Sequence, residues 1–288
     1  AIPLNLPAGN YIIIAQTNAI NSVVESNTSN NISIRYVSVI NPSPSDLTVE
    51  SIRKPDSVYL GYTIDTLRYG IFNQSVNTAL GVSTDGVYLS KSTLFDTTAQ
   101  LIGIKNKSIL MGPLSHDSIT FQPLVTGVTE GNYNLFVKTD IQNNIVETNK
   151  NNNTGIATTP IYVKVKPLPL GAVTPNTLQN LARYYKLSIP DSLLGATILV
   201  TLKSNDSLTA NNQLYIGGGY VPSAAHFDYA YGTPNYGNQQ IIISAVTDTA
   251  YYITANCISS NPPLQNITLE AKLMPFAILS VESNSGGN

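Results

Sequence analysis

Short runs in which hydrophobic and polar residues alternate extend along almost the whole chain. Alternation of this kind places apolar side chains on one face of an extended strand, and the runs are rich in the β-branched and aromatic residues that strands favour. Turn residues separate the runs at short intervals, which predicts packed sheets rather than alternating strands and helices. A helix is indicated only by NTLQNLARY, over residues 176–184. The clearest strand-like runs are YIIIAQT, ISIRYVSVI, DLTVESIR, GVYLS, YNLFVKT, IYVKVKP, ATILVTLKS, NQLYIGG and NITLEAKL.

Two stretches of the chain repeat one another. GNYIIIAQTNAINSVVESNTSNN begins at residue 9 and GNYNLFVKTDIQNNIVETNKNNN begins at residue 131, so they align without a gap at an offset of 122 (131 minus 9). Each predicts a strand, a turn and an Asn-rich corner that leads into a second strand. We therefore expect residues 1–41 to be the closing hairpin of a truncated domain. The chain would then begin inside one unit of a tandem array.

Two proline-rich breaks divide the chain, at INPSPSD (residues 40–46) and VKPLPLGAVTPN (residues 165–176). Proline removes a backbone donor and resists a place in a sheet, so we expect both breaks to be semi-stiff spacers. The predicted fold class is all-β, with tandem β-sandwiches. The predicted organisation is a truncated hairpin over 1–41, a complete sandwich over 42–168, a second type of sandwich over 169–280 and a linker over 281–288.

Composition narrows the classes of partner. Charged residues make up 11% of the chain and the net charge is −2, against about 25% charged residues in an average domain. The sequence has no run of lysine and arginine, so nucleic acid is not an expected partner. No apolar run reaches the roughly 18 residues of a membrane-spanning helix, and the N-terminus lacks the features of an intact signal peptide. The lone cysteine, Cys257, lies in the alternating run YYITANCIS and is expected in the core.

The middle of the chain resembles the CARDB family, the cell-adhesion-related domains of bacteria. The resemblance implies a seven-stranded immunoglobulin-like sandwich on an exported protein of many domains. The sequence departs from the family in the YLS segment, where Lys91 follows Ser90 in place of the usual acidic residues. The matching stretches are DLTVESI (46–52), GVYLSKSTLFDTTAQLIG (86–103), GNYNLFVKTDIQNNIVETNKNNN (131–153) and the same closing pattern at 9–31.

Residues 178–275 resemble a bacterial pre-peptidase C-terminal domain. This resemblance implies a small jelly-roll-like sandwich of the kind attached to secreted proteases and surface proteins. Some of these relatives bind insoluble polymers or calcium. The matching stretches are ARYYKLSIP, ATILVTLKS, QLYIGGGYVPSAAHFDYAYGTPNYGNQQIIIS and TAYYITANCIS.

The Asn-rich corner of the second repeat copy is a candidate calcium site. Calcium takes about six to eight oxygen ligands from side chains of this kind. The candidate ligands are Asp140, Asn143, Glu147, Asn149 and Asn152. The upstream copy carries Asn18 in place of Asp140, which leaves it one carboxylate short. The alternative is turn chemistry, because asparagine tolerates left-handed backbone and bonds its own chain, and Glu147 would then accept backbone amides.

Tyrosines form the second candidate site. The chain has 17 tyrosines and no tryptophan, and nine of the tyrosines fall between residues 184 and 252. Flat amphipathic rings stack on sugars and extended polymers, so we expect an extracellular polysaccharide or matrix protein as ligand. The alternative is that the rings pack the core or line a long loop. The candidate binding residues are Tyr220, Tyr229, Tyr231 and Tyr236.

Aspartate followed by serine or threonine, and then by an aliphatic residue or threonine, forms a third pattern. It resembles the acceptor pattern for O-linked sugars on exported proteins of the Bacteroidetes. The alternative is a set of turns, which favour the same residues. Seven of the 11 aspartates carry the pattern, namely Asp56, Asp65, Asp96, Asp117, Asp191, Asp206 and Asp248.

Catalytic constellations are absent from the sequence. It contains no HExxH or GxSxG motif, and IGGGY is not followed by the lysine of a phosphate-binding loop. His116 and Asp117 are neighbours on an expected strand, so their side chains point to opposite faces and do not form a dyad. We therefore expect no enzyme activity and no certain cofactor besides the candidate calcium.

The favoured function is a non-catalytic region of an exported bacterial surface adhesin or structural stalk. It would lie outside the cell or at its surface, next to further modules of the same chain. One alternative is an accessory substrate-binding region of a secreted hydrolase. Another is a passive spacer without a ligand.

Overall fold

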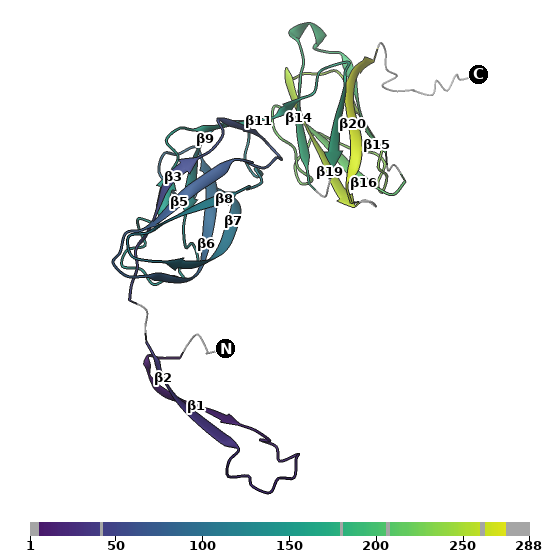
Figure 1. Ribbon diagram of the computed structural model, residues 1–288. Helices are drawn as coiled ribbons and strands as arrows, with labels where there is room; N and C mark the ends of the chain where they lie inside the picture. Colours follow the sequence, from purple (N-terminus) through teal and green to yellow (C-terminus); the bar gives the residue numbers. More distant parts are fainter. Residues whose placement is uncertain (1–5, 41–42, 179–180, 206–207, 260–262, 275–288) are drawn as a thin grey trace, which may run out of the picture.

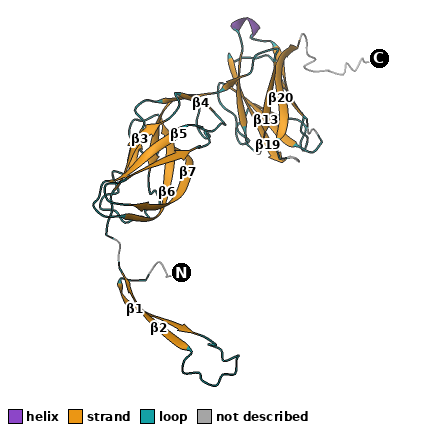
Figure 2. Ribbon diagram, in the orientation of Figure 1, coloured by secondary structure: helices purple, strands orange, loops and turns teal. Residues whose placement is uncertain are grey.

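The computed structural model describes residues 6–40, 43–178, 181–205, 208–259 and 263–274. A hairpin, a middle sandwich and a third sandwich follow one another along the chain (Figure 1). Within the described residues the regular structure is strand, apart from the short 3₁₀ helix η1, Asp191–Leu193 (Figure 2). The all-β fold class is thereby confirmed. The predicted linker over 281–288 lies outside the described residues.

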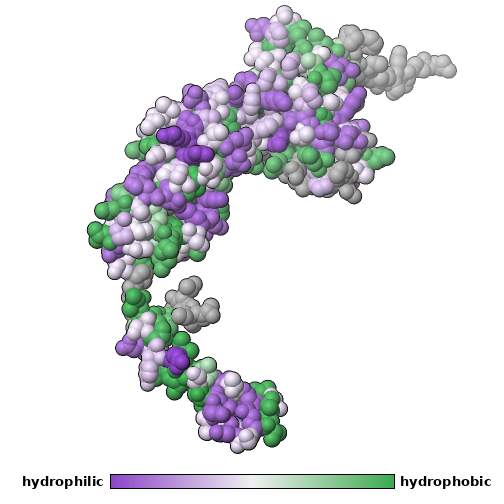
Figure 3. Space-filling view, in the orientation of Figure 1, coloured by the Kyte–Doolittle hydropathy of each residue, from purple (hydrophilic) through white to green (hydrophobic). Residues whose placement is uncertain are grey.

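The hairpin consists of β1 (Gly9–Gln16) and β2 (Ile32–Val39), paired in antiparallel register from Gly9↔Val39 to Gln16↔Ile32. Adding the offset of 122 to the bounds of β1 gives those of β9 (Gly131–Lys138), so the structure reproduces the sequence repeat. Burial differs between the copies. Ile13 is 51% exposed whereas its counterpart Leu135 is 0% exposed, and hydrophobic side chains lie on the surface of the hairpin (Figure 3).

The middle sandwich has two sheets. One has the order β4-β11-β9-β6-β7, with β10 beside β9, and the other has the order β3-β5-β8. The short strands β4 and β10, of three residues each, raise the number of strands above the seven implied by the family resemblance. The strands are β3 Leu47–Arg53, β4 Ser57–Tyr59, β5 Leu67–Asn73, β6 Ala79–Ser90, β7 Gln100–Met111, β8 His116–Phe121, β9 Gly131–Lys138, β10 Thr154–Ile156 and β11 Ile161–Lys164.

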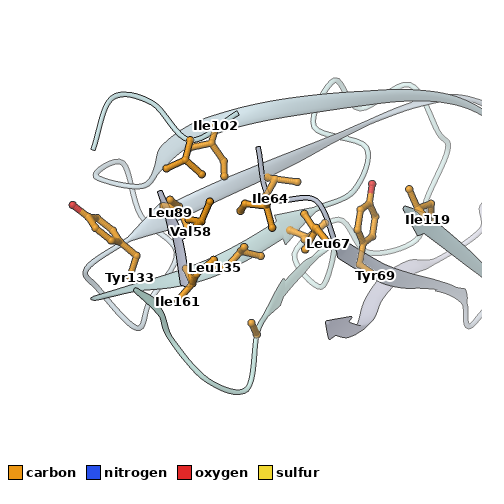
Figure 4. Packing of buried hydrophobic residues seen from close by; sticks show 14 of the residues in the cluster. Val58, Ile64, Leu67, Tyr69, Leu89, Ile102, Ile119, Tyr133, Leu135 and Ile161 are labelled. Carbon is orange, nitrogen blue, oxygen red and sulfur yellow. The ribbon is translucent and has the colours of Figure 1, made fainter. Parts of the chain in front are cut away.

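Alternating residues of these strands fill the space between the two sheets. Leu67 and Tyr69 of β5 point inward, as do Leu89 of β6 and Leu135 of β9, and all four are at most 1% exposed (Figure 4). Burying a side chain of this size contributes about 1.5–3 kcal/mol relative to leaving it in water. The hydrophobic core predicted from alternation is therefore present in this sandwich.

The third sandwich also has two sheets, with the orders β12-β14-β19-β16-β17 and β13-β20-β15-β18. Its core includes Cys257, which is buried as predicted and accepts a hydrogen bond from Gln265 Nε2 at 3.0 Å. The strands are β12 Lys166–Pro167, β13 Val173–Leu178, β14 Arg183–Ser188, β15 Thr197–Ser204, β16 Asn211–Gly218, β17 Tyr229–Ala230, β18 Gln239–Ile243, β19 Ala250–Ser259 and β20 Gln265–Met274.

Two local predictions between residues 165 and 184 are wrong. The proline-rich stretch supplies β12 and β13 rather than a spacer, because both are edge strands, where a missing N–H costs little. Val165 belongs to the core of the middle sandwich, and the next residue, Lys166, already pairs in a strand of the third sandwich. No separate linker therefore lies between the two sandwiches at this point. The expected helix over 176–184 is absent from its described residues, since both of its ends pair as strands in β13 and β14.

Candidate functional site

The Asn-rich corner begins with a turn that Asp140 closes. Its Oδ1 accepts a hydrogen bond from the Asn144 amide at 2.9 Å, and its Oδ2 accepts one from the Ile145 amide at 3.0 Å. Asp140 and Asn143 both have left-handed backbone, with φ of 47° and 57°. These two residue types adopt that conformation more readily than most, because their short polar side chains bond nearby backbone. The corner is thus built from local polar contacts.

Glu147 joins this corner to the start of the sandwich. Its Oε2 accepts a hydrogen bond from the Leu47 amide at 2.8 Å, and its Oε1 accepts one from Asn153 Nδ2 at 2.9 Å. Its side chain is fully buried. Burial raises the pKa of Glu147, although the hydrogen bonds from Asn153 and Leu47 oppose that rise. The side chain therefore ties the closing segment to β3, which lies 100 residues earlier.

A lysine lies between the two carboxylates of the corner. Lys150 Nζ is 3.3 Å from Asp140 Oδ2 and 3.9 Å from Glu147 Oε1, and it donates to the Ile145 carbonyl at 2.8 Å. A calcium ion that bridged both carboxylates would need this place. In the described part of the chain, no three acidic, histidine or cysteine side chains gather as a metal site.

The three asparagines predicted as calcium ligands have separate contacts. The Asn143 amide donates to the Asp140 carbonyl in a turn, and Asn149 Oδ1 accepts from the Asn151 amide at 3.0 Å. Asn152 Nδ2 donates to Asp46 Oδ1 at 2.8 Å. The contacts of Asn143 and Asn149 are the turn chemistry that the sequence offered as the alternative, whereas Asn152 bonds to a residue 106 positions away. Calcium binding at the corner stays a prediction, with Lys150 as the competing cation.

The upstream repeat copy keeps the hydrogen bonds of the corner. Asn18 Oδ1 accepts from the Val23 amide at 3.1 Å, as Asp140 accepts from the residue at the equivalent position. Glu25 Oε1 accepts from Asn31 Nδ2 at 3.1 Å, as Glu147 accepts from Asn153. These local hydrogen bonds of the corner therefore form in the hairpin too, where no sandwich surrounds them.

The sequence analysis did not predict a buried carboxylate in the middle sandwich. Asp85 is 0% exposed, and its Oδ1 accepts from Thr139 Oγ1 at 2.7 Å and Ser83 Oγ at 3.0 Å. Its Oδ2 accepts from the Tyr69 hydroxyl at 2.9 Å and lies 3.4 Å from Lys107 Nζ. Burial, together with the charge of Asp85, raises the pKa of Tyr69. The signal in the sequence was a single aspartate inside a strand-like run.

Lys107 lies between this buried carboxylate and the surface. Its Nζ is also 3.8 Å from Oδ2 of the exposed Asp117. Burial lowers the pKa of the Lys107 ammonium, while Asp85 and Asp117 oppose that shift. Asp117 pairs with Lys107, and His116 Nδ1 lies 2.6 Å from Glu50 Oε1, so the two adjacent side chains contact different partners, as expected of neighbours that form no dyad.

The four predicted binding tyrosines do not share one site. Tyr229 and Tyr231 pack against the core of the third sandwich. Tyr220 donates to Asp228 Oδ1 at 2.9 Å and stacks on His226 with ring centroids 4.3 Å apart. Tyr236 is 50% exposed and lines a depression of about 380 Å³ with Leu208 and Thr201 among other residues. Of the four, only Tyr236 offers an open ring at a depression.

Side chains of the middle and third sandwiches contact each other at an interface, called the joint below, which includes Gly61, Tyr62 and Glu130 of the middle sandwich. Arg183 of the third sandwich lies at its centre of contacts. Its Nη1 donates to the Gly61 carbonyl, and its guanidinium lies 4.4 Å from the centroid of the Tyr62 ring. Asn176 Nδ2 donates to the hydroxyls of Tyr62, at 2.9 Å, and Tyr185, at 2.7 Å. Burial raises the pKa of Tyr185 to about 12. Polar groups of the two sandwiches thus bond to one another across the joint, while the buried Arg183 Nε has no hydrogen-bond partner among the described residues.

A second contact of the joint is an ion pair. Lys186 Nζ lies 2.7 Å from Glu130 Oε2, and the Tyr252 hydroxyl donates to the same oxygen at 2.9 Å. Burial works against ionisation of Glu130, but the hydrogen bonds from Lys186 and Tyr252 outweigh it and lower its pKa. A lowered carboxyl pKa contributes stability that is present at neutral pH and lost as the pH falls through the folded-state pKa.

The chain also packs closely at the joint. Gly61 has φ +81°, and a Cβ added there would lie 2.8 Å from the Ala182 carbonyl oxygen and 2.9 Å from the Tyr184 ring. Tyr184 and Val221 of the third sandwich pack against the core of the middle one. The joint is therefore a packed interface, and sequence reasoning missed it because it treated the proline-rich stretch as a spacer.

Residues 44–156 match the family model of CARDB, which confirms this resemblance for the middle sandwich. CARDB is a cell-adhesion-related, immunoglobulin-like and non-catalytic domain family of surface-associated proteins. The pre-peptidase resemblance of the third sandwich stays a prediction. In the described part of the chain, no helix has the length and apolar character needed to cross a membrane.

Several solved structures resemble part of the chain. The CARDB domain of a Pyrococcus furiosus protein, in complex with di-metal ions, is 25% identical over 44% of this chain and 94% of that chain, with a TM-score of 0.31. A solution structure of that domain is 26% identical over 42% and 95%, with a TM-score of 0.28. A β-glucosidase from Listeria innocua in complex with glucose is 14% identical over 41% and 16%, with a TM-score of 0.28. The comparison with curated proteins gave no match.

Proposed function

We propose that this chain is a non-catalytic, load-bearing region of an exported bacterial surface adhesin or stalk. The observation that carries the proposal is the packed joint, at which Arg183, Gly61 and Tyr62 hold two sandwiches together. A stalk must keep a fixed direction from one module to the next, and an interface with hydrogen bonds and packed side chains across it resists bending where a flexible linker does not. The CARDB match of the middle sandwich supports a place at the cell surface.

Alanine at Gly61 is expected to open the joint. The side chain would meet the Ala182 carbonyl oxygen at 2.8 Å, and the left-handed backbone adds a cost of about 1–2 kcal/mol. Small-angle scattering should give a larger radius of gyration, and NMR relaxation should show the two sandwiches tumbling independently. Acid pH is expected to move the wild type in the same direction, because protonation of Glu130 removes the ion pair with Lys186.

Gly171→Ala is the matched control for this experiment. Gly171 has φ +80°, close to the φ of Gly61, but no atom lies within 4 Å of an added Cβ. The control therefore carries the same backbone cost without the contact across the joint, and its scattering curve should match that of the wild type. Independent tumbling of the two sandwiches in the wild type itself would rule out the load-bearing role.

The second candidate function is an accessory substrate-binding region of a secreted hydrolase. The depression lined by Tyr236, Leu208 and Thr201 in the third sandwich favours it, because an open aromatic ring beside apolar and hydroxyl groups suits a sugar ring. The full chain should then bind an insoluble polysaccharide in pull-down assays, and Tyr236→Ala should weaken this about tenfold. Tyr229→Ala is the comparison, since that ring packs on the core. Equal retention of wild type and Tyr236→Ala on every polymer would remove this candidate.

A further inference from the structure

The outward face of the sheet β3-β5-β8 carries a polar depression of about 380 Å³. Gly70 lies at its centre in the middle strand, with Glu50 opposite on β3 and Ser118 opposite on β8. The absence of a side chain at Gly70 lets the Glu50 side chain lie across the strand, since an added Cβ would be 2.9 Å from Glu50 Cγ. The other residues that line the depression are Ser51, Arg53, Arg68, Tyr69, His116 and Asp117.

A β-bulge places Arg53 on this face. Glu50 pairs with Gly70 and Arg53 pairs with Arg68, so two residues of β3 stand opposite the single residue Tyr69. The extra residue lets Ile52 pack against the core while Arg53 emerges beside the depression. Ser51, inside the bulge, has φ 53°, a conformation that is costly for a non-glycine residue. Bulges often re-aim a side chain in this way next to functional sites.

The bulge brings two arginines directly opposite each other. Like charges in this position of an antiparallel pair destabilise a sheet. In the described part of the chain, neither Arg53 nor Arg68 has an ion pair or a hydrogen bond from its guanidinium. The acidic residues at the depression have their own partners, because Glu50 Oε1 lies 2.6 Å from His116 Nδ1 and Asp117 Oδ2 lies 3.8 Å from Lys107 Nζ. Neither arginine of the depression therefore has a direct ionic partner, although the carboxylates of Glu50 and Asp117 line the same depression.

We propose that Arg53 and Arg68 together bind one carboxylate or sulfate group of an acidic extracellular polysaccharide. Two guanidiniums on facing strands match the geometry of a planar or tetrahedral oxyanion through paired N–H donors. The hydroxyls of Ser118 and Ser51 line the same depression and suit the hydroxyls of a sugar. The stack of His116 on Phe72, with ring centroids 4.4 Å apart, adds a flat surface at its edge. This inference rests on the proposed adhesin function and names the ligand class for the middle sandwich.

The test compares binding of the full chain to four immobilised polymers. These are a sulfated glycosaminoglycan, polygalacturonate, a neutral glucan and poly-glutamate, measured by biolayer interferometry at fixed ionic strength. The wild type should bind the two acidic polysaccharides and not the glucan. Arg53→Gln/Arg68→Gln should weaken that binding about tenfold or more, because it removes charge-assisted hydrogen bonds. The same variant should melt at the wild-type temperature or above, since the repulsion between the two arginines is gone.

The control variant is Arg35→Gln/Lys272→Gln, which removes two positive charges far from the depression in sequence and on other sheets. It should bind the acidic polysaccharides like the wild type. An equal loss in both variants would mean general attraction of polyanions and would overturn the site. Poly-glutamate binding as tightly as the polysaccharides would overturn the ligand class. If these binding results contradict the arginine site, the scattering test of the joint is unaffected. The proposed ligand and the proposed stalk function can therefore be disproved independently of each other.

Discussion

Replacing Asp85 with alanine is expected to lower the free energy of unfolding of the middle sandwich by about 3–5 kcal/mol. Asp85 is fully buried, and its loss leaves the ammonium of Lys107 inside the protein without its closest anion. The hydroxyls of Tyr69 and Thr139 lose their acceptor at the same time. Scanning calorimetry measures the effect, since the third sandwich has its own core and should keep its own transition.

Two further variants separate the charge from the hydrogen bonds. Tyr69→Phe removes one donor to Asp85 and should cost about 1–2 kcal/mol. Adding Lys107→Met to Asp85→Ala should restore part of the lost stability, because the unpaired buried charge is then gone. If the single Asp85→Ala variant melts within a degree or so of the wild type, the buried ion pair does not stabilise this sandwich.

Glu147→Ala is the second substitution with a large expected effect, about 3 kcal/mol on the middle sandwich. The buried carboxylate holds the Leu47 amide at 2.8 Å and Asn153 Nδ2 at 2.9 Å, and both donors would lose their acceptor. The closing segment would also lose its tie to β3. Thermal unfolding followed by circular dichroism measures the change.

The repeat supplies a matched control for this substitution. Glu25→Ala removes the equivalent carboxylate of the hairpin, which accepts from Asn18 and Asn31 but lies outside a sandwich. Its effect on the main transition should be close to zero.

A chelator added to the wild type decides between calcium and lysine at the corner. We expect an unchanged melting temperature, because the ammonium of Lys150 already lies 3.3 Å from Asp140. If the chelator instead lowers the melting temperature of the wild type but not that of Glu147→Ala, the calcium site is established.

Strand positions and local turns followed from the sequence by itself. Alternation determines which residues of a strand face inward, so Leu67, Tyr69 and Leu135 are buried as the pattern predicts. The repeat predicted the same hairpin twice, and both copies form the same hydrogen bonds at Asp140 and Asn18. These features depend on residues close together in the chain, which is why one sequence window contains their cause.

Three features became evident only from the tertiary structure. They are the joint between the sandwiches, the buried ion pair of Asp85 with Lys107, and the facing arginines Arg53 and Arg68. Arg183 meets Gly61 across 122 residues, and Arg53 meets Arg68 only because a bulge shifts the register of two strands. Pro167 and Pro175 of the supposed spacer lie in sheets because their strands are edge strands, and a sequence does not reveal which strand is an edge. Strand pairing joins segments that are distant in sequence, so its partners and register depend on how the whole core packs.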